Sequence, residues 1–182
     1  YLQRARQRVL GLLGDFDKNR FAILKAITTL RQLSLDPKLI DAEKYKNVSS
    51  TKLDRLLEQL DEVVSEGHRA LIFSQFKSFL TKIRQALDDR GIPYLYLDGA
   101  TKQRGELLKE FKTTDVPLFL ISLKSGGFGL NLTEADYCFL IDPWWNPAVE
   151  QQAIDRAHRI GQTKPVMVYR LIAKGTIEEK VM

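Results

Sequence analysis

Short runs of continuous apolar residues alternate with helical segments from residue 70 onward, and this alternation limits the possible folds more than any other feature. The expected strands are residues 70–73, 94–97, 118–121, 137–141 and 166–172. Strands that are apolar at every position need cover on both faces, which is typical of a parallel sheet flanked by helices. The sequence therefore predicts an α/β fold whose ligands bind beyond the carboxyl ends of the strands.

Helical periodicity precedes this region, in residues 1–14 and 20–34, and Asp36-Pro37 ends it. Residues 41–51 are polar and indicate a linker, after which Ser50 or Thr51 caps a helix of leucines and valines. We therefore expect two units, a helical unit with its linker at residues 1–48 and the α/β unit at residues 49–182. The chain begins with Tyr1, and we expect it to be a piece of a longer protein.

The net charge of +5 lies in residues 1–31, which hold seven basic and two acidic groups. Such a segment is typical of a surface that faces phosphates, or of a helix face that is merely solvated. The single cysteine, Cys138, lies in an expected buried strand, so no disulfide framework forms and a reducing, intracellular compartment is favoured. No run reaches the roughly 18 apolar residues of a membrane span, so no membrane partner is expected.

A helix is expected from Pro147 to Gly161, because proline suits a first helical turn and glycine suits the position after the last. At about 100° per residue, two stripes lie side by side on this helix. The apolar stripe holds Val149, Ala153, Ala157 and Ile160, and the polar stripe holds Gln152, Arg156 and Arg159. Arginines held near a packed face suit bidentate recognition of phosphate or carboxylate, and a structural salt bridge to a core carboxylate is the alternative.

The glycine-rich loop at residues 125–131 follows an expected strand, where backbone N–H groups can approach phosphates or simply form a tight turn. It matches neither a dinucleotide-binding fingerprint nor a Walker A loop. Trp144 and Trp145 follow the expected strand at residues 137–141. Aromatic residues at such a position either stack on nucleic-acid bases or pack beneath a neighbouring loop. His68 and His158 lack ligand partners at suitable spacing, so no metal site is expected.

Five segments, taken together, resemble motifs of the second RecA-like lobe of Swi/Snf-type DNA-translocating ATPases, within helicase superfamily two. They are residues 71–76, 96–101, 125–133, 145–147 and 152–162, of which the last contains Asp-Arg-Ala-His-Arg-Ile-Gly-Gln. The resemblance covers about residues 20–182. It implies a RecA-like parallel sheet with helices on both faces, and it identifies the N-terminal helices as a helical protrusion.

The resemblance also implies roles for individual residues. Arg156 and Arg159 match arginine fingers that stabilise charge on the γ-phosphate of ATP. Gln152, Gly129 and Asn131 match positions that face the nucleotide. The positions that match DNA contacts are Ser74, Gly99, Thr101, Lys124, Ser125, Gly126 and Trp145.

The implied activity is ATP-dependent translocation on double-stranded DNA, with ATP and Mg²⁺ as cofactors and DNA-bound proteins as further partners. Walker A and Walker B motifs are not in this sequence; the family carries them on a first lobe, which would hold Mg²⁺. We therefore expect the chain alone to hydrolyse no ATP. The Pro-Trp-Trp-Asn-Pro wording is similar to bacterial and repair-type branches, which favours a DNA-associated location in a bacterial cytoplasm or nucleoid over a nucleus.

Two alternatives remain. An RNA helicase of the DEAD-box type is disfavoured by Gln162, since those enzymes resemble His-Arg-Ile-Gly-Arg at this point. A non-catalytic α/β module would bind nucleic acid with a salt-dependent affinity that is indifferent to Arg156 and Arg159.

Overall fold

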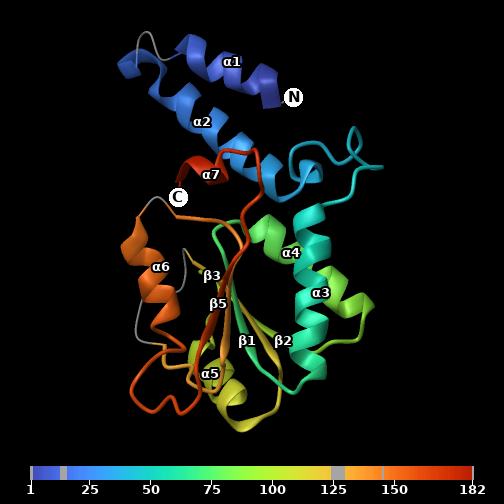
Figure 1. Ribbon diagram of the computed structural model, residues 1–182, viewed down its shortest axis with the longest axis vertical. Helices are drawn as coiled ribbons and strands as arrows, with labels where there is room; N and C mark the ends of the chain where they lie inside the picture. Colours follow the sequence, from blue (N-terminus) through green and yellow to red (C-terminus); the bar gives the residue numbers. More distant parts are fainter. Residues whose placement is uncertain (1, 13–15, 124–129, 145, 182) are drawn as a thin grey trace.

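A computed structural model describes residues 2–12, 16–123, 130–144 and 146–181 of the chain. Its centre is a five-stranded sheet in the order β2-β3-β1-β4-β5, with every neighbouring pair parallel (Figure 1). The strands are β1 (Ala70–Ser74), β2 (Tyr94–Leu97), β3 (Leu118–Ser122), β4 (Tyr137–Leu140) and β5 (Met167–Arg170). The predicted α/β class is confirmed, and each strand lies where the apolar runs placed it.

The central strand β1 pairs with β3 on one side and with β4 on the other, so Ala70 lies opposite both Leu118 and Tyr137. All carboxyl ends therefore meet at one edge of the sheet. β5 is shorter than the predicted strand 166–172, although Leu171 N still donates to Leu140 O at 3.0 Å. Past this bond, the carbonyl of Leu171 accepts from Lys52 Nζ at 2.8 Å.

Two hydrophobic cores cover the two faces of the sheet, since successive strand side chains point to opposite sides. The helices α3 (Thr51–Ser65) and α4 (Lys77–Asp89) pack on the face that carries Ile72 and Leu120. The helices α5 (Arg104–Thr113) and α6 (Pro147–Ile154) pack on the face that carries Phe73 and Phe119. Figure 1 shows α3 and α4 on one side of the sheet and α6 on the other. The strands β1 and β3 are buried on both faces, as continuous apolar strands require, whereas the edge strand β5 is only partly covered.

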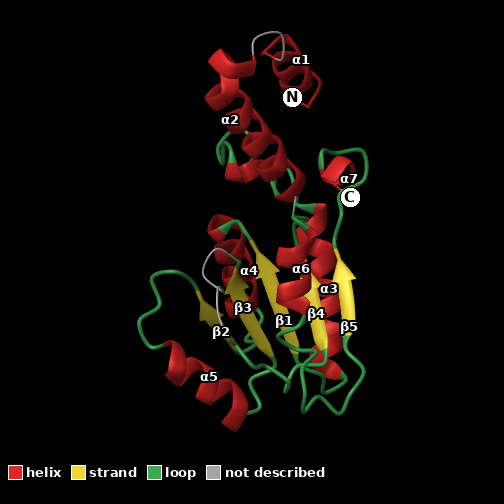
Figure 2. Ribbon diagram, turned by 90° about the vertical axis from the view of Figure 1, so that its left-hand side faces the viewer, coloured by secondary structure: helices red, strands yellow, loops and turns green. Residues whose placement is uncertain are grey.

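The N-terminal helices α1 (Leu2–Leu12) and α2 (Phe16–Leu35) lie beyond the carboxyl edge of the sheet (Figure 2). α2 begins four residues earlier than predicted and ends just before Asp36, whose side chain accepts from Lys38 N at the start of the short helix η2 (Pro37–Leu39). Ser50 is the cap of α3, because its hydroxyl accepts from Leu53 N at 3.1 Å. The same hydroxyl donates to Leu35 O at 2.6 Å, which joins the end of α2 to the start of α3.

The prediction of one helix from Pro147 to Gly161 is wrong in its second half. α6 ends at Ile154, and residues 155–161 form tight turns closed by bonds such as Gln162 N to Arg159 O at 3.0 Å. Ala153 and Ala157 are buried as predicted, whereas Ile160 is fully exposed. Gly161 has a φ of +104°, so it supplies the left-handed residue of a turn and not the end of the helix.

The closing helix α7 (Glu178–Val181) begins where Thr176 Oγ1 accepts from Glu178 N at 3.2 Å. None of the helices in the described part of the chain combines the length and apolar content that crossing a bilayer requires.

Candidate functional site

The structure brings together three of the residues that the sequence assigned to nucleotide binding. Gln152 lies in the last turn of α6, and Arg156 and Arg159 lie in the turns that follow. All three line one pocket of about 250 Å³, together with Leu130 and Asp155. The three polar side chains therefore lie on one side, as predicted for a straight helix, although the backbone that carries them is the end of α6 followed by turns.

The two arginines of this pocket differ in burial. Arg156 is 6% exposed, whereas Arg159 is exposed to solvent. Burial lowers the pKa of the Arg156 guanidinium, and the neighbouring charge of Arg159 lowers it further. Two like charges in a partly dehydrated pocket are stabilised when an anion enters. The backbone holds this arrangement, because Leu132 N donates to Arg156 O at 2.9 Å.

Asn131 lies beside this pocket. It lines a neighbouring cavity of about 800 Å³ with Asp155, Arg159 and His158. Its side-chain oxygen is buried and accepts no hydrogen bond from the described residues. A buried amide oxygen without a donor is a place where a hydroxyl or N–H of a ligand fits. Arg159 lines both cavities, so Asn131 and the arginines border adjoining spaces.

Gln162 fixes the turns that carry the arginines. Its side-chain nitrogen Nε2 lies 2.9 Å from Thr133 O, 2.9 Å from Ala135 O and 3.0 Å from Ala157 O. A single amide thus ties residues 155–162 to the segment that leads into β4. The sequence singled out Gln162 only as a family marker, and its mechanical role depends on a contact between distant segments.

The predicted DNA contacts that are described lie at the carboxyl edge of the sheet. Ser74, at the end of β1, is buried and its hydroxyl donates to Asp142 Oδ1. A direct contact between this hydroxyl and DNA would require it to leave Asp142, so its role stays a prediction. Gly99 is exposed in a turn after β2, and Thr101 closes that turn by accepting from Asp98 N at 3.0 Å.

Asp98 stabilises the turn at Gly99. Its carboxylate accepts from Ala100 N at 2.9 Å and pairs with Lys77 Nζ at 2.7 Å. The hydrogen bond from Lys77 lowers the pKa of Asp98 to about 2, so the carboxylate is ionised at neutral pH. The other predicted site residues, Lys124, Ser125, Gly126, Gly129 and Trp145, lie outside the described residues.

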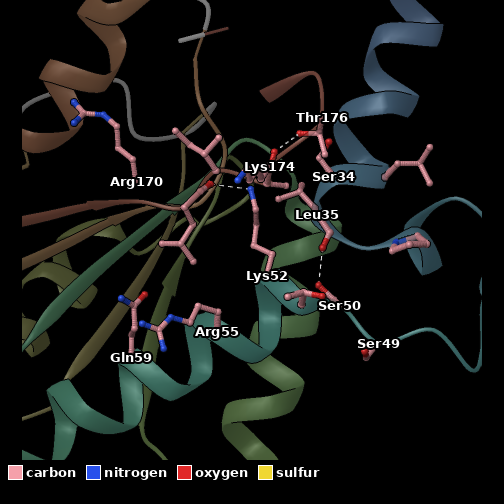
Figure 3. A pocket seen from close by; sticks show the side chains of 16 residues that line it. Ser34, Leu35, Ser49, Ser50, Lys52, Arg55, Gln59, Arg170, Lys174 and Thr176 are labelled. Carbon is pink, nitrogen blue, oxygen red and sulfur yellow. Dashed lines mark hydrogen bonds between the residues drawn. The ribbon is translucent and has the colours of Figure 1, made fainter. Parts of the chain in front are cut away.

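A buried ionic cluster at the same sheet edge was not predicted. Lys52 Nζ lies 2.7 Å from Glu178 Oε1, and it also donates to the strand-end carbonyls of Ile141 at 2.9 Å and Leu171 at 2.8 Å. Lys52 borders a cavity of about 670 Å³ between α2, the start of α3 and the chain after β5 (Figure 3). In the sequence, Lys52 looks like an ordinary polar residue in the first turn of a helix. Its partners are distant in the chain and come close to it only in the folded structure.

No group of three or more histidine, cysteine, aspartate or glutamate side chains is arranged to hold a metal ion within the described ranges. The profile of the helicase conserved C-terminal domain matches residues 51–161. The chain belongs to the helicase C-terminal domain family. This family assignment accounts for the order of the motifs from β1 to Gln162, and it agrees with the RecA-like sheet.

Relatives narrow the branch of the family. The DNA repair protein RAD5 of Cryptococcus neoformans is 54% identical over 100% of this helicase domain and 15% of its own length. An uncharacterised ATP-dependent helicase of Mycoplasma pneumoniae is 41% identical over 91% of the domain and 16% of its own length. The domain therefore spans only about a sixth of these curated relatives.

A solved structure supports the same placement. The Sulfolobus solfataricus SWI2/SNF2 ATPase core in complex with double-stranded DNA is 32% identical, with a TM-score of 0.76 over 99% of this domain and 40% of that chain. The prediction of a second RecA-like lobe of the Swi/Snf type is confirmed.

Proposed function

We propose that this helicase domain is the second lobe of an ATP-dependent translocase of double-stranded DNA, and that Arg156 and Arg159 act on the phosphates of ATP held by a first lobe. The convergence of Gln152, Arg156 and Arg159 on one pocket carries the proposal. Arg159 forms no ion pair with the residues that the structure describes, which disfavours a purely structural salt bridge for this residue.

The donors of the pocket fit phosphate oxygens. Planar guanidinium groups donate in pairs to such oxygens, and the side-chain amide of Gln152 adds a further donor or acceptor. ATP, when bound, supplies the phosphoanhydride bond whose cleavage drives the motor. Arg156 is the pre-oriented finger, because its side chain is buried and its backbone carbonyl accepts from Leu132 N, and exposed Arg159 has the freedom to meet the γ-phosphate as the lobes close.

Mg²⁺ does not fit this pocket, because its walls bring two cations and one carboxylate, Asp155, whose Oδ1 accepts from Gln151. Oxygen ligands are what Mg²⁺ requires. We therefore assign Mg²⁺ to the first lobe.

For the DNA we propose the carboxyl edge of the sheet, where Ser74 ends β1 and the turn of Gly99 and Thr101 follows β2. The Sulfolobus relative was solved in complex with double-stranded DNA, which supports DNA as the ligand. Closure of the two lobes around ATP would then be a hinge motion that moves the DNA contacts of one lobe relative to the other. The protein would act inside the cell on DNA, and its relatives include a fungal DNA repair protein and a mycoplasma ATP-dependent helicase.

The test is ATP hydrolysis by the intact protein, with and without double-stranded DNA. We expect DNA to stimulate turnover, and Arg159→Ala to lower the stimulated rate by roughly 10³-fold while DNA binding persists. Arg55→Ala is the matched control, because Arg55 is an exposed arginine whose described partner is Glu58 in the same helix. The 182-residue chain alone should show no turnover.

An ATP hydrolysis rate that changes neither with DNA nor with Arg159→Ala would refute the proposed translocase function. Salt-dependent DNA binding without such turnover would instead identify a non-catalytic binding module.

A further inference from the structure

A small cavity opens between the second half of α3 and the sheet, toward the opposite end of the molecule from α1 and α2 (Figure 1). Its volume is about 170 Å³. Its main lining consists of carboxylate and amide side chains of α3 and aromatic side chains of β4 and β5, namely Gln59, Glu62, Glu66, Tyr137, Phe139 and Tyr169. We call it the aromatic cavity. Sites for whole small-molecule ligands usually measure roughly 300–1,000 Å³, so this cavity has the size for a single side chain.

The sheet side of the aromatic cavity is a stack of three rings. Between centroids, the ring of Tyr169 lies 5.2 Å from that of Phe139 and 6.0 Å from that of Tyr137, with interplanar angles of 14° and 4°. Phe139 is fully buried, whereas both tyrosines are half-buried. Their mutual stacking fixes the orientation of the tyrosine rings. The cavity therefore has a preformed aromatic wall, which is the kind of surface that attracts a planar cation.

The helix side of the cavity supplies negative charge. Glu62 and Glu66 are exposed and lie four residues apart at the end of α3, a spacing at which like charges repel each other. Within the described ranges Glu62 forms no ion pair, and Glu66 has only His68 Nε2, at 3.9 Å, which is charged only when protonated. None of the described residues that line the cavity is basic. An incoming cation would relieve the repulsion between the two carboxylates.

The negative potential of the cavity extends to Tyr137. Partial burial raises the pKa of its hydroxyl, and the negative charges of Glu66 and Asp136 raise it further. Asp136 is already engaged, because its Oδ2 lies 2.6 Å from His68 Nδ1, and the His68 ring lies 5.0 Å from the ring of Tyr137. Glu62 and Glu66 are therefore the carboxylates that are left to pair with a ligand.

We propose that the aromatic cavity binds one arginine side chain of a partner protein. The guanidinium stacks on the tyrosine rings and donates to Glu62 and Glu66. Arginine fits better than lysine, because its planar group stacks on rings, forks toward two carboxylates and is more weakly hydrated than an ammonium group. Nucleic acid is disfavoured as the ligand, since its phosphates would meet the same two carboxylates.

The surroundings of the cavity favour a protein as the source of this arginine. Met167 is 46% exposed and stands opposite Tyr137 in the register of β4 and β5, so an apolar side chain is available beside the cavity. Among the described strands, β5 lies at the edge of the sheet, where a partner segment can add backbone contacts. The inference goes beyond the proposed function and does not depend on it, because the cavity is lined by other residues than the pocket of Arg156 and Arg159.

The test measures binding of fluorescein-labelled peptides to the intact protein by fluorescence anisotropy. The peptides share a glycine–serine sequence and differ at one central position, which is arginine, lysine, trimethyl-lysine or glutamine. We expect the arginine peptide to bind at least about fivefold more tightly than the lysine peptide, because only arginine stacks and forks at once. Trimethyl-lysine should also bind more weakly than arginine, since it keeps the charge but has no N–H donor. The glutamine peptide should not bind measurably.

Variants of the cavity locate the binding. Glu62→Gln combined with Glu66→Gln should weaken binding of the arginine peptide by roughly tenfold or more, because two charge-assisted hydrogen bonds become neutral. Tyr169→Leu should weaken it by roughly threefold through loss of the cation–π contact. Both glutamates are exposed, so the double variant should fold, which circular dichroism verifies. Glu58→Gln is the matched control, because Glu58 is exposed on the same helix and pairs with Arg55.

Four results would overturn the inference. They are equal affinity for the arginine and lysine peptides, tighter binding of trimethyl-lysine, unchanged affinity after both glutamate substitutions, and no measurable binding at millimolar peptide. An equal loss of affinity in Glu58→Gln would also overturn it, since the attraction would then be the general charge of α3. DNA-stimulated ATP hydrolysis of the double glutamine variant should equal that of the wild type. Failure of the translocase proposal, measured with Arg159→Ala, is therefore distinguishable from failure of this one.

Discussion

Replacing Lys52 by methionine should destabilise the domain more than most single substitutions, because methionine keeps the apolar stem and removes the charge. Lys52 and Glu178 are 8% and 1% exposed, and Lys52 Nζ serves three acceptors. The variant leaves a buried carboxylate, the buried carbonyl of Ile141 and the partly buried carbonyl of Leu171 without this donor. Breaking one side of a buried ion pair costs about 3–5 kcal/mol. For a chain of this length that lowers the melting temperature by roughly 6–20 °C.

Urea unfolding followed by circular dichroism measures this cost, and Lys109→Met is the control, since Lys109 is exposed on α5. Adding Glu178→Gln to Lys52→Met removes the orphaned charge but keeps an acceptor for Ala173 N. This second change should restore about 1–3 kcal/mol. If Lys52→Met lowers the free energy of unfolding by less than about 1 kcal/mol, or if the double variant recovers nothing, then pairing of Lys52 with the buried carboxylate of Glu178 does not stabilise the fold as argued.

Three further predictions concern single groups. Burial raises the pKa of Asp142 to about 6. Because this pKa is above the value in the unfolded chain, ionisation of Asp142 opposes folding. The free energy of unfolding of Asp142→Asn should therefore rise by up to about 3 kcal/mol relative to that of the wild type as pH rises from 4 to 7. Urea midpoints at several pH values measure that difference, and one that does not change with pH would contradict it. Burial raises the pKa of the Cys138 thiol to about 12, so iodoacetamide at pH 8 should modify it only after unfolding, and mass spectrometry of the native protein would reveal any exception. Ser50→Ala removes the cap of α3 and a bond to Leu35 O, which should cost about 1–2 kcal/mol in the same urea assay; an unchanged midpoint would mean that water replaces both bonds.

The strands and the cap of α3 were predictable because their signals are local. Continuous apolar runs marked the five strands, and Ser50 stood directly before a leucine series of helical period. The end of α6 was not predictable in this way. Its periodic pattern continues to Gly161, whereas the side chain of Gln162 fixes the turns through carbonyls of Thr133 and Ala135. Helix period alone carries no information about such a distant contact.

The candidate site divides in the same manner. Gln152, Arg156 and Arg159 could be grouped from their spacing, and they share a pocket even though the helix is shorter than predicted. Lys52 could not be found, because its partner Glu178 lies 126 positions away in the chain. Asn131 was named from family resemblance alone, and its unsatisfied buried oxygen is visible only in the folded chain.

The long separation between Lys52 and Glu178 has a consequence for synthesis on the ribosome. Lys52 emerges 126 residues before its partner, and the strand ends whose carbonyls it needs, at Ile141 and Leu171, also emerge late. Until these partners have been synthesised, burying the first turn of α3 would bury the Lys52 ammonium group without an acceptor. The carboxyl edge of the sheet, where the DNA contacts are proposed, therefore closes only after Glu178 has been synthesised. A nascent chain halted before Glu178 would hold an open edge that chaperones and proteases can recognise.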